Sequence, residues 1–137
     1  MLTLIYLSGV HNYHKKCNYL CPSKNKTMEF FKETPFAMTI CDKEGKILDM
    51  NDKSISTFVK DGQSIIGCSL FDCHPEPARA KLKRLLQDHN VNAYTIEKNG
   101  IKKMIYQSPW FENGEFMGYI ELSLELPEDM PHFVRMG

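Results

Sequence analysis

A cysteine and a histidine stand next to each other at Cys73 and His74, directly before Pro75 and a run of residues with helical spacing. The neutral imidazole of His74 can ligate an iron ion, whereas the alternative is that the ring caps the helix or faces solvent. The amino end of a helix lowers the pKa of a thiol, which makes Cys73 a candidate redox group. These two residues are the sharpest candidates for chemistry in the chain.

A second group of histidines and cysteines lies near the amino end. His11, His14, Cys17 and Cys21 have the spacing His-x-x-His-x-x-Cys-x-x-x-Cys, and imidazole together with thiolate suits a tetrahedral zinc ion. These residues are closely packed in sequence and lack the long loop that structural zinc sites usually enclose. We therefore predict no metal site from this group.

The sequence shows no arrangement of side chains that is typical of an enzyme. It has no pair of acidic residues at useful spacing, no glycine-rich phosphate loop and no nucleophile elbow. We predict that the chain is not an enzyme.

The charge and the cysteines limit the classes of partner and compartment. The chain has 17 basic and 17 acidic residues, a balance that gives no field to attract nucleic acid or an anionic membrane. The longest apolar stretch, residues 1–10, is too short to span a bilayer and has no basic residue ahead of it. An odd number of cysteines favours reduced thiols over a disulfide framework. We predict a cytoplasmic protein whose partners are proteins or small molecules.

Periodicity and turn residues predict the elements that must position these groups. A helical lead-in at residues 28–33 precedes two strands, 36–41 and 46–50, and Asn51 is expected to cap a short helix. A short apolar turn at 69–72 leads into an amphipathic helix at 76–88. Three strands follow at 91–98, 101–110 and 115–126, joined by Asn-Gly pairs that are strong hairpin signals. The alternation of the last strand shifts near Glu121, which predicts one bulge.

These elements define one domain with an extension at each end. We predict the domain at residues 28–127 and a tail at 128–137. Residues 1–27 differ in character, because an apolar start gives way to a lysine-rich stretch without acidic residues. We expect a leader or extension there, either flexible or absent from the native chain, since Met28 stands directly before the patterned region.

The order of the elements resembles a PAS domain over about residues 29–126. The phrases that carry the resemblance are residues 40–47 at the first hairpin, Met50-Asn51 after it, residues 66–72 before the long helix, and Asn113-Gly114 with residues 117–120 at the closing hairpin. The resemblance implies an α+β fold, in which a five-stranded antiparallel sheet has helices packed on one face. In relatives, the cavity between them binds haem, flavin, small metabolites or nothing.

The resemblance also implies a set of residues that line this cavity. The candidates are Met38, Ile40, Met50, Phe58, Leu70, His74, Leu82, Met104, Tyr106, Ile120 and Leu122. If the cofactor were haem, His74 would be its ligand. Flavin is less well matched, because the family motif Gly-x-Asn-Cys-Arg-Phe-Leu-Gln differs from residues 67–74 of this chain, which read Gly-Cys-Ser-Leu-Phe-Asp-Cys-His.

We therefore expect a sensory, signal-transduction domain without an output module of its own. It would bind a small ligand, contact a protein partner, or form a homodimer. The alternative is a haem-binding redox or gas sensor that uses His74.

Overall fold

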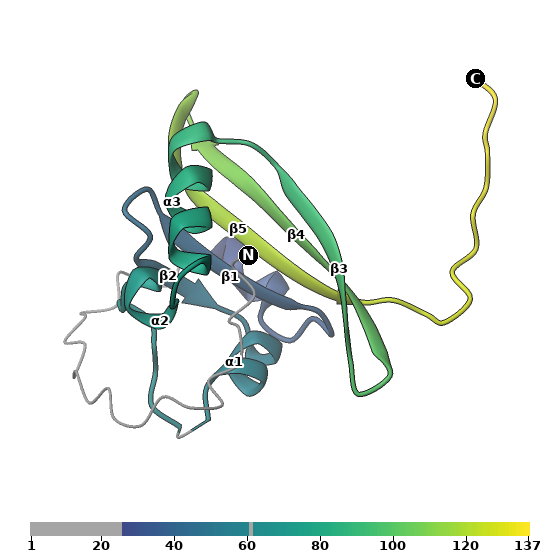
Figure 1. The fold of residues 1–137 in the computed structure, drawn as a ribbon, viewed down its shortest axis with the longest axis horizontal. Coiled ribbons are helices and arrows are strands. Elements are labelled where there is room, and N and C mark those ends of the chain that lie inside the picture. Colours follow the sequence, from purple (N-terminus) through teal and green to yellow (C-terminus); the bar gives the residue numbers. More distant parts are fainter. Residues whose placement is uncertain (1–25, 61) are drawn as a thin grey trace.

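The computed structural model describes residues 26–60 and 62–137. Nine elements follow one another along this part of the chain (Figure 1). They are the 3₁₀ helix η1 (Lys26–Phe31), the strands β1 (Ala37–Asp42) and β2 (Ile47–Met50), the helices α1 (Asp52–Phe58), α2 (Leu70–Cys73) and α3 (Ala78–Asp88), and the strands β3 (Asn92–Lys98), β4 (Ile101–Glu112) and β5 (Glu115–Glu125). For every element except α1, the bounds lie within two residues of the range that the sequence pattern predicts.

The strands form one antiparallel sheet in the order β2-β1-β5-β4-β3. Both predicted Asn-Gly turns close a hairpin, and Asn99, Gly100, Asn113 and Gly114 all have positive φ, as a type I′ turn requires. Figure 1 shows the helices α1, α2 and α3 grouped together, with the hairpin of β3 and β4 reaching away from them. The predicted fold class is confirmed: an α+β domain whose five-stranded antiparallel sheet has helices on one face.

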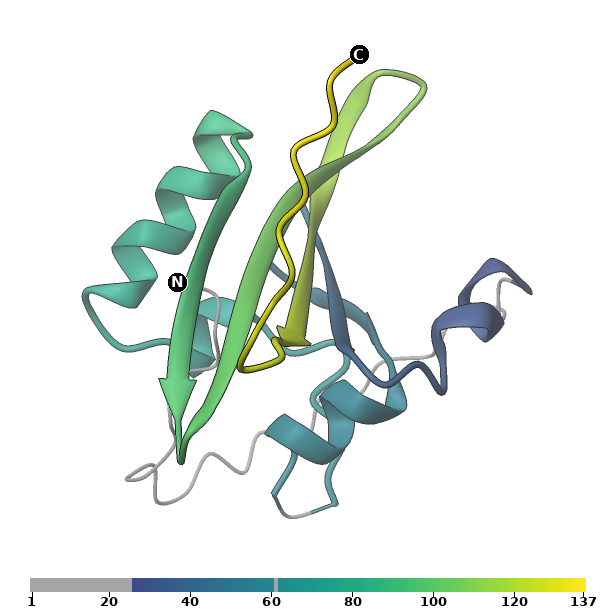
Figure 2. The same cartoon turned by 90° about the vertical axis from the view of Figure 1, so that its right-hand side faces the viewer.

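Contacts between side chains identify the face of the sheet that the helices cover. The hydroxyl of Thr39 on β1 lies 2.6 Å from that of Ser54 on α1. The hydroxyl of Tyr119 on β5 lies 2.7 Å from the carbonyl oxygen of Leu85 on α3. Figure 2 shows α3 alongside β3, with α1 toward the other end of the strands. Side chains in register with Thr39 and Tyr119 therefore point toward the helices, which we call the inner face.

The predicted bulge near Glu121 is wrong. Strand β5 pairs in regular register with β1 and with β4 on both sides of this residue. The irregularities of the sheet lie instead between Trp110 and Phe111 and between Ile40 and Cys41. The alternation only looked shifted because Glu121 is a charged side chain on the inner face, where an apolar residue is usual.

Asn51 joins three parts of the domain. Its side-chain oxygen accepts from the backbone N–H of Ser54, which caps α1, and from that of Met38 on β1, at 3.0 and 2.9 Å. Its amide nitrogen lies 3.1 Å from the carbonyl oxygen of Phe31 and 2.8 Å from that of Phe36. The residue is 2% exposed. One side chain therefore fixes η1 and the start of α1 against the sheet.

The carboxyl end of the chain leaves the sheet after β5. Residues 126–137 form no helix or strand and extend away from the domain (Figure 1). The predicted leader at residues 1–27 lies outside the described residues, apart from the first two residues of η1. Among the described helices, none is long and apolar enough to cross a membrane.

Candidate ligand-binding site

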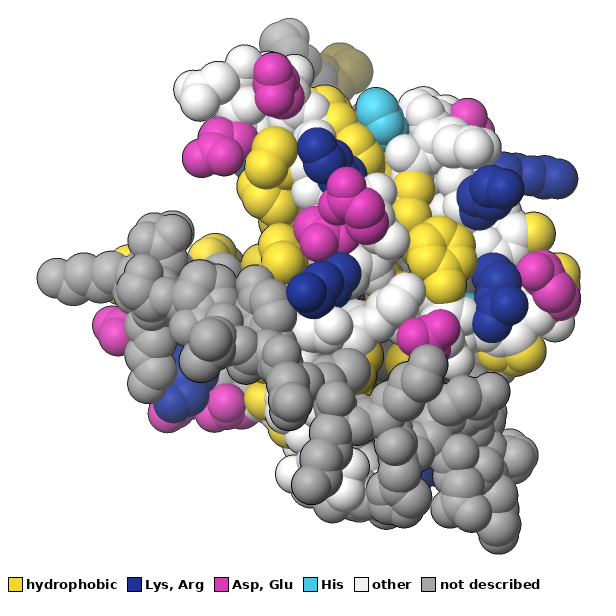
Figure 3. Space-filling model, turned by 90° about the vertical axis from the view of Figure 1, so that its left-hand side faces the viewer, with side chains coloured by type: hydrophobic (Ala, Val, Ile, Leu, Met, Phe, Trp, Pro, Cys, Tyr) yellow, Lys and Arg dark blue, Asp and Glu magenta, His cyan; other side chains and the backbone are white. Residues whose placement is uncertain are grey.

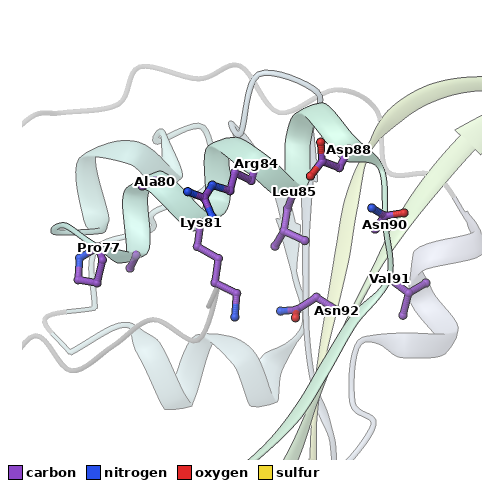
Figure 4. Close-up of a pocket in the computed structure, with 10 residues that line it drawn as sticks. Pro77, Ala80, Lys81, Arg84, Leu85, Asp88, Asn90, Val91 and Asn92 are labelled. Carbon is purple, nitrogen blue, oxygen red and sulfur yellow. The ribbon is translucent and has the colours of Figure 1, made fainter.

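A groove of about 530 Å³ runs between α3 and the start of β3. The helix contributes Ala78, Lys81, Arg84, Leu85 and Asp88, and the strand contributes Asn92. Figure 4 shows Lys81 and Leu85 pointing from the helix toward the strand, and Asn92 pointing into the same space from the strand. The volume falls within the range of pockets that hold small molecules.

The amphipathic pattern of α3 explains why this groove is both charged and apolar. Ala78, Leu82 and Leu85 are buried on one face of the helix. Lys81 and Arg84 lie at the edge of that face and are exposed. The groove follows this border, so that its floor is apolar and its helical rim is basic.

The lysine of the rim is held over an aromatic ring. The Nζ atom of Lys81 lies 5.3 Å from the centre of the Tyr94 ring on β3, which is within the range of a cation–π contact.

On the face of the molecule shown in Figure 3, basic, acidic and apolar side chains are mixed, and no sign of charge prevails there. Any preference of the groove for a charged ligand therefore depends on the few residues that line it.

A row of polar side chains leads from the groove into the interior. The amide nitrogen of Asn92 donates to Oε1 of Gln107 on β4, and the amide nitrogen of Gln107 donates to Oε2 of Glu121 on β5, both across 2.6 Å. Strand pairing sets this row, because Asn92 is the register partner of Gln107 and Gln107 that of Glu121. Thr39 pairs with Glu121 on the far side. We call Asn92, Gln107 and Glu121 the polar row.

The polar row ends on a buried carboxyl group. Gln107 is fully buried and Glu121 is 6% exposed. Burial raises the pKa of Glu121 to about 7, because removal from water disfavours the charged form, and the hydrogen bond from Gln107 opposes this effect. The interior of the domain therefore holds a carboxyl group that titrates near neutral pH.

The comparisons with known proteins agree on one fold. Residues 31–89 match the family model described as PAS fold. The PAS domain of BvgS from Bordetella pertussis superimposes with a TM-score of 0.55 at 24% identity, over 76% of this chain and 89% of that one. The chain forms a PAS-like domain. A sensory box sensor histidine kinase from Vibrio cholerae gives a TM-score of 0.56 at 16% identity, over 75% of this chain and 90% of that one.

Another solved structure supports the same fold for this PAS domain. A C-terminal domain from Streptococcus mutans superimposes with a TM-score of 0.60 at 16% identity, over 72% of this chain and 81% of that one. A comparison with curated protein sequences gave no match. At these identities the solved structures establish the fold of the PAS domain and nothing about its ligand.

The pocket candidates from the sequence divide between the two faces of the PAS sheet. Register places six of them on the outer face, away from the helices: Met38, Ile40, Met104, Tyr106, Ile120 and Leu122. The other five, Met50, Phe58, Leu70, His74 and Leu82, lie on the helical side, where four belong to or pack against the main core cluster. None of the eleven lines the groove between α3 and β3. Their assignment to a ligand pocket stays a prediction.

His74 is buried at the end of α2 in this PAS domain. The ring is 1% exposed, and its Nδ1 atom lies 2.6 Å from the carbonyl oxygen of Leu70. It does not line the groove. These surroundings do not fit a haem ligand, because haem needs an open cavity on one side of the ring.

The cysteines differ from the sequence expectation. Cys73 is the last residue of α2, not the first of α3, and burial followed by the charge of Asp72 raises its pKa. A reactive thiolate is therefore disfavoured. Burial also raises the pKa of Cys41 to about 11. Cys41 and Cys73 are free cysteines, whereas Cys68 is disulfide-bonded, so the expectation of a reduced thiol is wrong at Cys68. The zinc-like group of His11, His14, Cys17 and Cys21 lies outside the described residues.

The residues of the groove and of the polar row are not among the site residues that the sequence predicts. The sequence pattern predicts ordinary surface positions for Lys81, Arg84 and Asn92. Within their own helix or strand, these three residues lie on the polar side. Glu121 carried a usable signal, because a charged residue interrupts the apolar stretch 116–124. A buried polar group of this kind marks a functional candidate more reliably than an apolar one does.

Proposed function

We propose that this PAS domain is a sensory module that binds a small molecule in the groove between α3 and β3 and passes the change on to a protein. The observation that carries the proposal is the groove itself, about 530 Å³ in volume and lined by both basic and apolar side chains. No catalytic role is proposed.

The anchoring of α3 supports a signal that starts in this groove. The helix ends at His89, whose backbone is left-handed and whose ring stacks on Phe116 of β5 at 3.7 Å. The Tyr119 hydroxyl holds the last turn at Leu85. A ligand wedged between α3 and β3 acts on a helix whose carboxyl end is held against β5. It biases the domain by its differential affinity for two arrangements of α3.

A ligand screen by NMR tests the location of the site. Mixtures of small metabolites are added to the isotope-labelled chain, and backbone amide shifts are mapped. We expect the shifts of a binding compound to cluster at residues 77–92. The variant Lys81→Met weakens binding, whereas Lys83→Met, on the exposed side of the same helix, leaves it unchanged. Shifts that cluster around His74 or on the outer face of the sheet contradict the proposal.

We propose that the protein that receives the signal is a second copy of this chain, which docks through η1. Phe30 is 81% exposed although η1 is held in place, since Asn51 lies within hydrogen-bonding distance of the neighbouring Phe31 carbonyl. A fixed and exposed aromatic side chain suits an interface anchor. The half-buried apolar residues of the outer face, among them Ile120 and Leu122, extend the apolar surface of the domain.

Sedimentation over a concentration series tests this step. The double variant Phe30→Ala and Phe31→Ala should shift the protein toward the monomer. Phe133→Ala is the matched control, because Phe133 is 77% exposed in the C-terminal segment and is not expected to form the interface. A wild-type chain that stays monomeric at every concentration, or a dimer that the double variant leaves intact, refutes docking through η1.

A further inference from the structure

The proposed function rests on the groove, and the inference here deepens it by naming the ligand class and its regulation. We propose that the groove takes a small organic carboxylate, and that the binding of this anion is coupled through the polar row to the uptake of a proton by Glu121. The groove and the buried carboxyl group would thus form one linked system.

The walls of the groove fit an anion with an apolar body. Lys81 reaches from α3 toward Asn92 on β3, so a cation and an amide flank the same space (Figure 4). Ala78, Leu85 and Val91 supply apolar surface beside them. Asp88 stands toward the carboxyl end of the helix, one turn beyond Arg84. A carboxylate at Lys81 with its hydrocarbon part against Leu85 uses both kinds of wall.

The hydrogen bonds of the polar row have a direction. Asn92 donates to Gln107, and Gln107 donates to Glu121. An ionised carboxylate can only accept, so the charged form of Glu121 fixes this direction. One of the two N–H groups of Asn92 then donates to Gln107. The carbonyl oxygen and the other N–H of Asn92 are left to face the groove. A carbonyl oxygen repels a bound carboxylate.

Protonation of Glu121 allows the direction to reverse. A neutral carboxyl group has an O–H that can donate to Oε1 of Gln107 once that amide turns over. The Gln107 nitrogen then donates to the oxygen of Asn92, and both N–H groups of Asn92 are free to face the groove. Two N–H donors of Asn92 bind a carboxylate more tightly than one N–H donor and one carbonyl oxygen do. The anion therefore binds more tightly to the form that carries the proton.

Other ionisable side chains lie on the elements around Glu121. They include Cys41 on β1, Tyr119 on β5, Lys103 on β4, Lys53 on α1 and His74 on α2. Lys53 and Lys103 both lie near Glu125, at 3.7 and 3.5 Å, and burial holds the thiol of Cys41 and the phenol of Tyr119 neutral at physiological pH. The charged groups of α3, Lys81, Arg84 and Asp88, line the groove, whereas Glu121 does not.

Linkage gives the coupling two separate signatures. Since the protonated form binds the anion better, we expect benzoate to bind about tenfold more tightly at about pH 6 than at about pH 8. Reciprocity then requires bound benzoate to move the titration of the Glu121 carboxyl to higher pH by a corresponding amount. The second signature is read from carbon NMR of the Glu121 side chain and does not depend on measuring affinity.

The experiment titrates the whole chain with benzoate at both pH values, followed by amide shifts. Benzamide is the control ligand, because it has the same shape without the charge. Glu121→Gln should bind benzoate with the same affinity at both pH values, since it carries no titrating group. Gln107→Met keeps Glu121 but breaks the row, so it should also remove the pH dependence. Either variant suffices if the other fails to fold.

The outcomes separate the inference from the proposed function. Equal affinity for benzoate at both pH values in the wild-type chain, with Glu121 titrating between them, overturns the coupling and leaves a ligand-binding groove. Benzamide that binds as tightly as benzoate, or benzoate that does not bind, overturns the carboxylate class. The proposed function itself fails only if the metabolite screen finds no ligand at residues 77–92.

Discussion

The side-chain amide of Gln107 donates to a carboxyl oxygen of Glu121 across 2.6 Å, with both residues buried beneath the helices. This pair puts a titratable group and its only described side-chain donor on neighbouring strands of the inner face. A glutamate in such a place makes the stability of the domain depend on pH.

The sign of that dependence follows from the direction of the pKa shift. The pKa of Glu121 is raised from 4.5 to about 7, so the folded state holds the proton more tightly than the unfolded chain does. The contribution to the free energy of unfolding is therefore fully present below about pH 4 and is lost as the pH rises toward 7. Urea unfolding across this window should show the loss in the wild-type chain and not in Glu121→Gln.

A matched control uses a neighbouring acid on the same strand. Glu125 is exposed near Lys53 and Lys103, and Glu125→Gln should keep the pH slope of the wild-type chain. At about pH 8 we expect Glu121→Gln to be more stable than the wild-type chain, because no charge is buried. Identical slopes for wild type and Glu121→Gln contradict the assignment of the buried carboxyl.

Asn51→Ala should lower the free energy of unfolding by about 2 to 4 kcal/mol, because several buried backbone groups lose their partner at once. Asn51→Ser should lose less, since a serine can still cap α1. Ser69 caps α2 through a single contact to Phe71, and Ser69→Ala should cost about 1 kcal/mol or less. Chemical denaturation of the three variants checks this order, and equal losses at both caps would contradict it.

Tyr119→Phe removes the hydroxyl that donates to the carbonyl oxygens of Leu85, in the last turn of α3, and of Asn90, just after the helix. We expect a loss of about 1 to 2 kcal/mol and faster hydrogen exchange at the carboxyl end of α3. Tyr106→Phe is the control, because Tyr106 is 37% exposed on the outer face, and it should change stability by less than about 0.5 kcal/mol. A change in exchange that spreads evenly over the domain argues against this anchor.

Gly118→Ala should be the most damaging glycine substitution in the sheet. The residue has a φ of 148°, and a Cβ atom there would collide with the carbonyl oxygen of Cys41. That oxygen also accepts from Nε1 of Trp110, which reaches across β5. We expect a loss above about 2 kcal/mol, against about 1 kcal/mol for Gly114→Ala, where a Cβ atom meets open space. Thermal unfolding of the two variants tests this difference, and similar losses of stability in both would refute the predicted steric clash.

Much of this fold can be predicted from short segments of the sequence. The Asn-Gly pairs at positions 99 and 113 predict two hairpins because a type I′ turn needs residues that tolerate positive φ. The apolar stripe of α3 and the cap at Asn51 are likewise visible within a few residues. Each of these signals depends on neighbours in the chain, which is why the order of the elements could be predicted, and the bounds of all except α1 to within two residues.

The candidate site was decided by the tertiary structure. Asn92, Gln107 and Glu121 are separated by 15 and 14 residues, and only the pairing of three strands brings them into one row. The face of the sheet to which Ile120 and Leu122 point follows from the helices that pack on the other face, and no single strand reveals that choice. The groove between α3 and β3 forms only when the helix packs beside the strand. Sequence patterns specify local geometry, whereas the juxtaposition of distant side chains depends on register and packing.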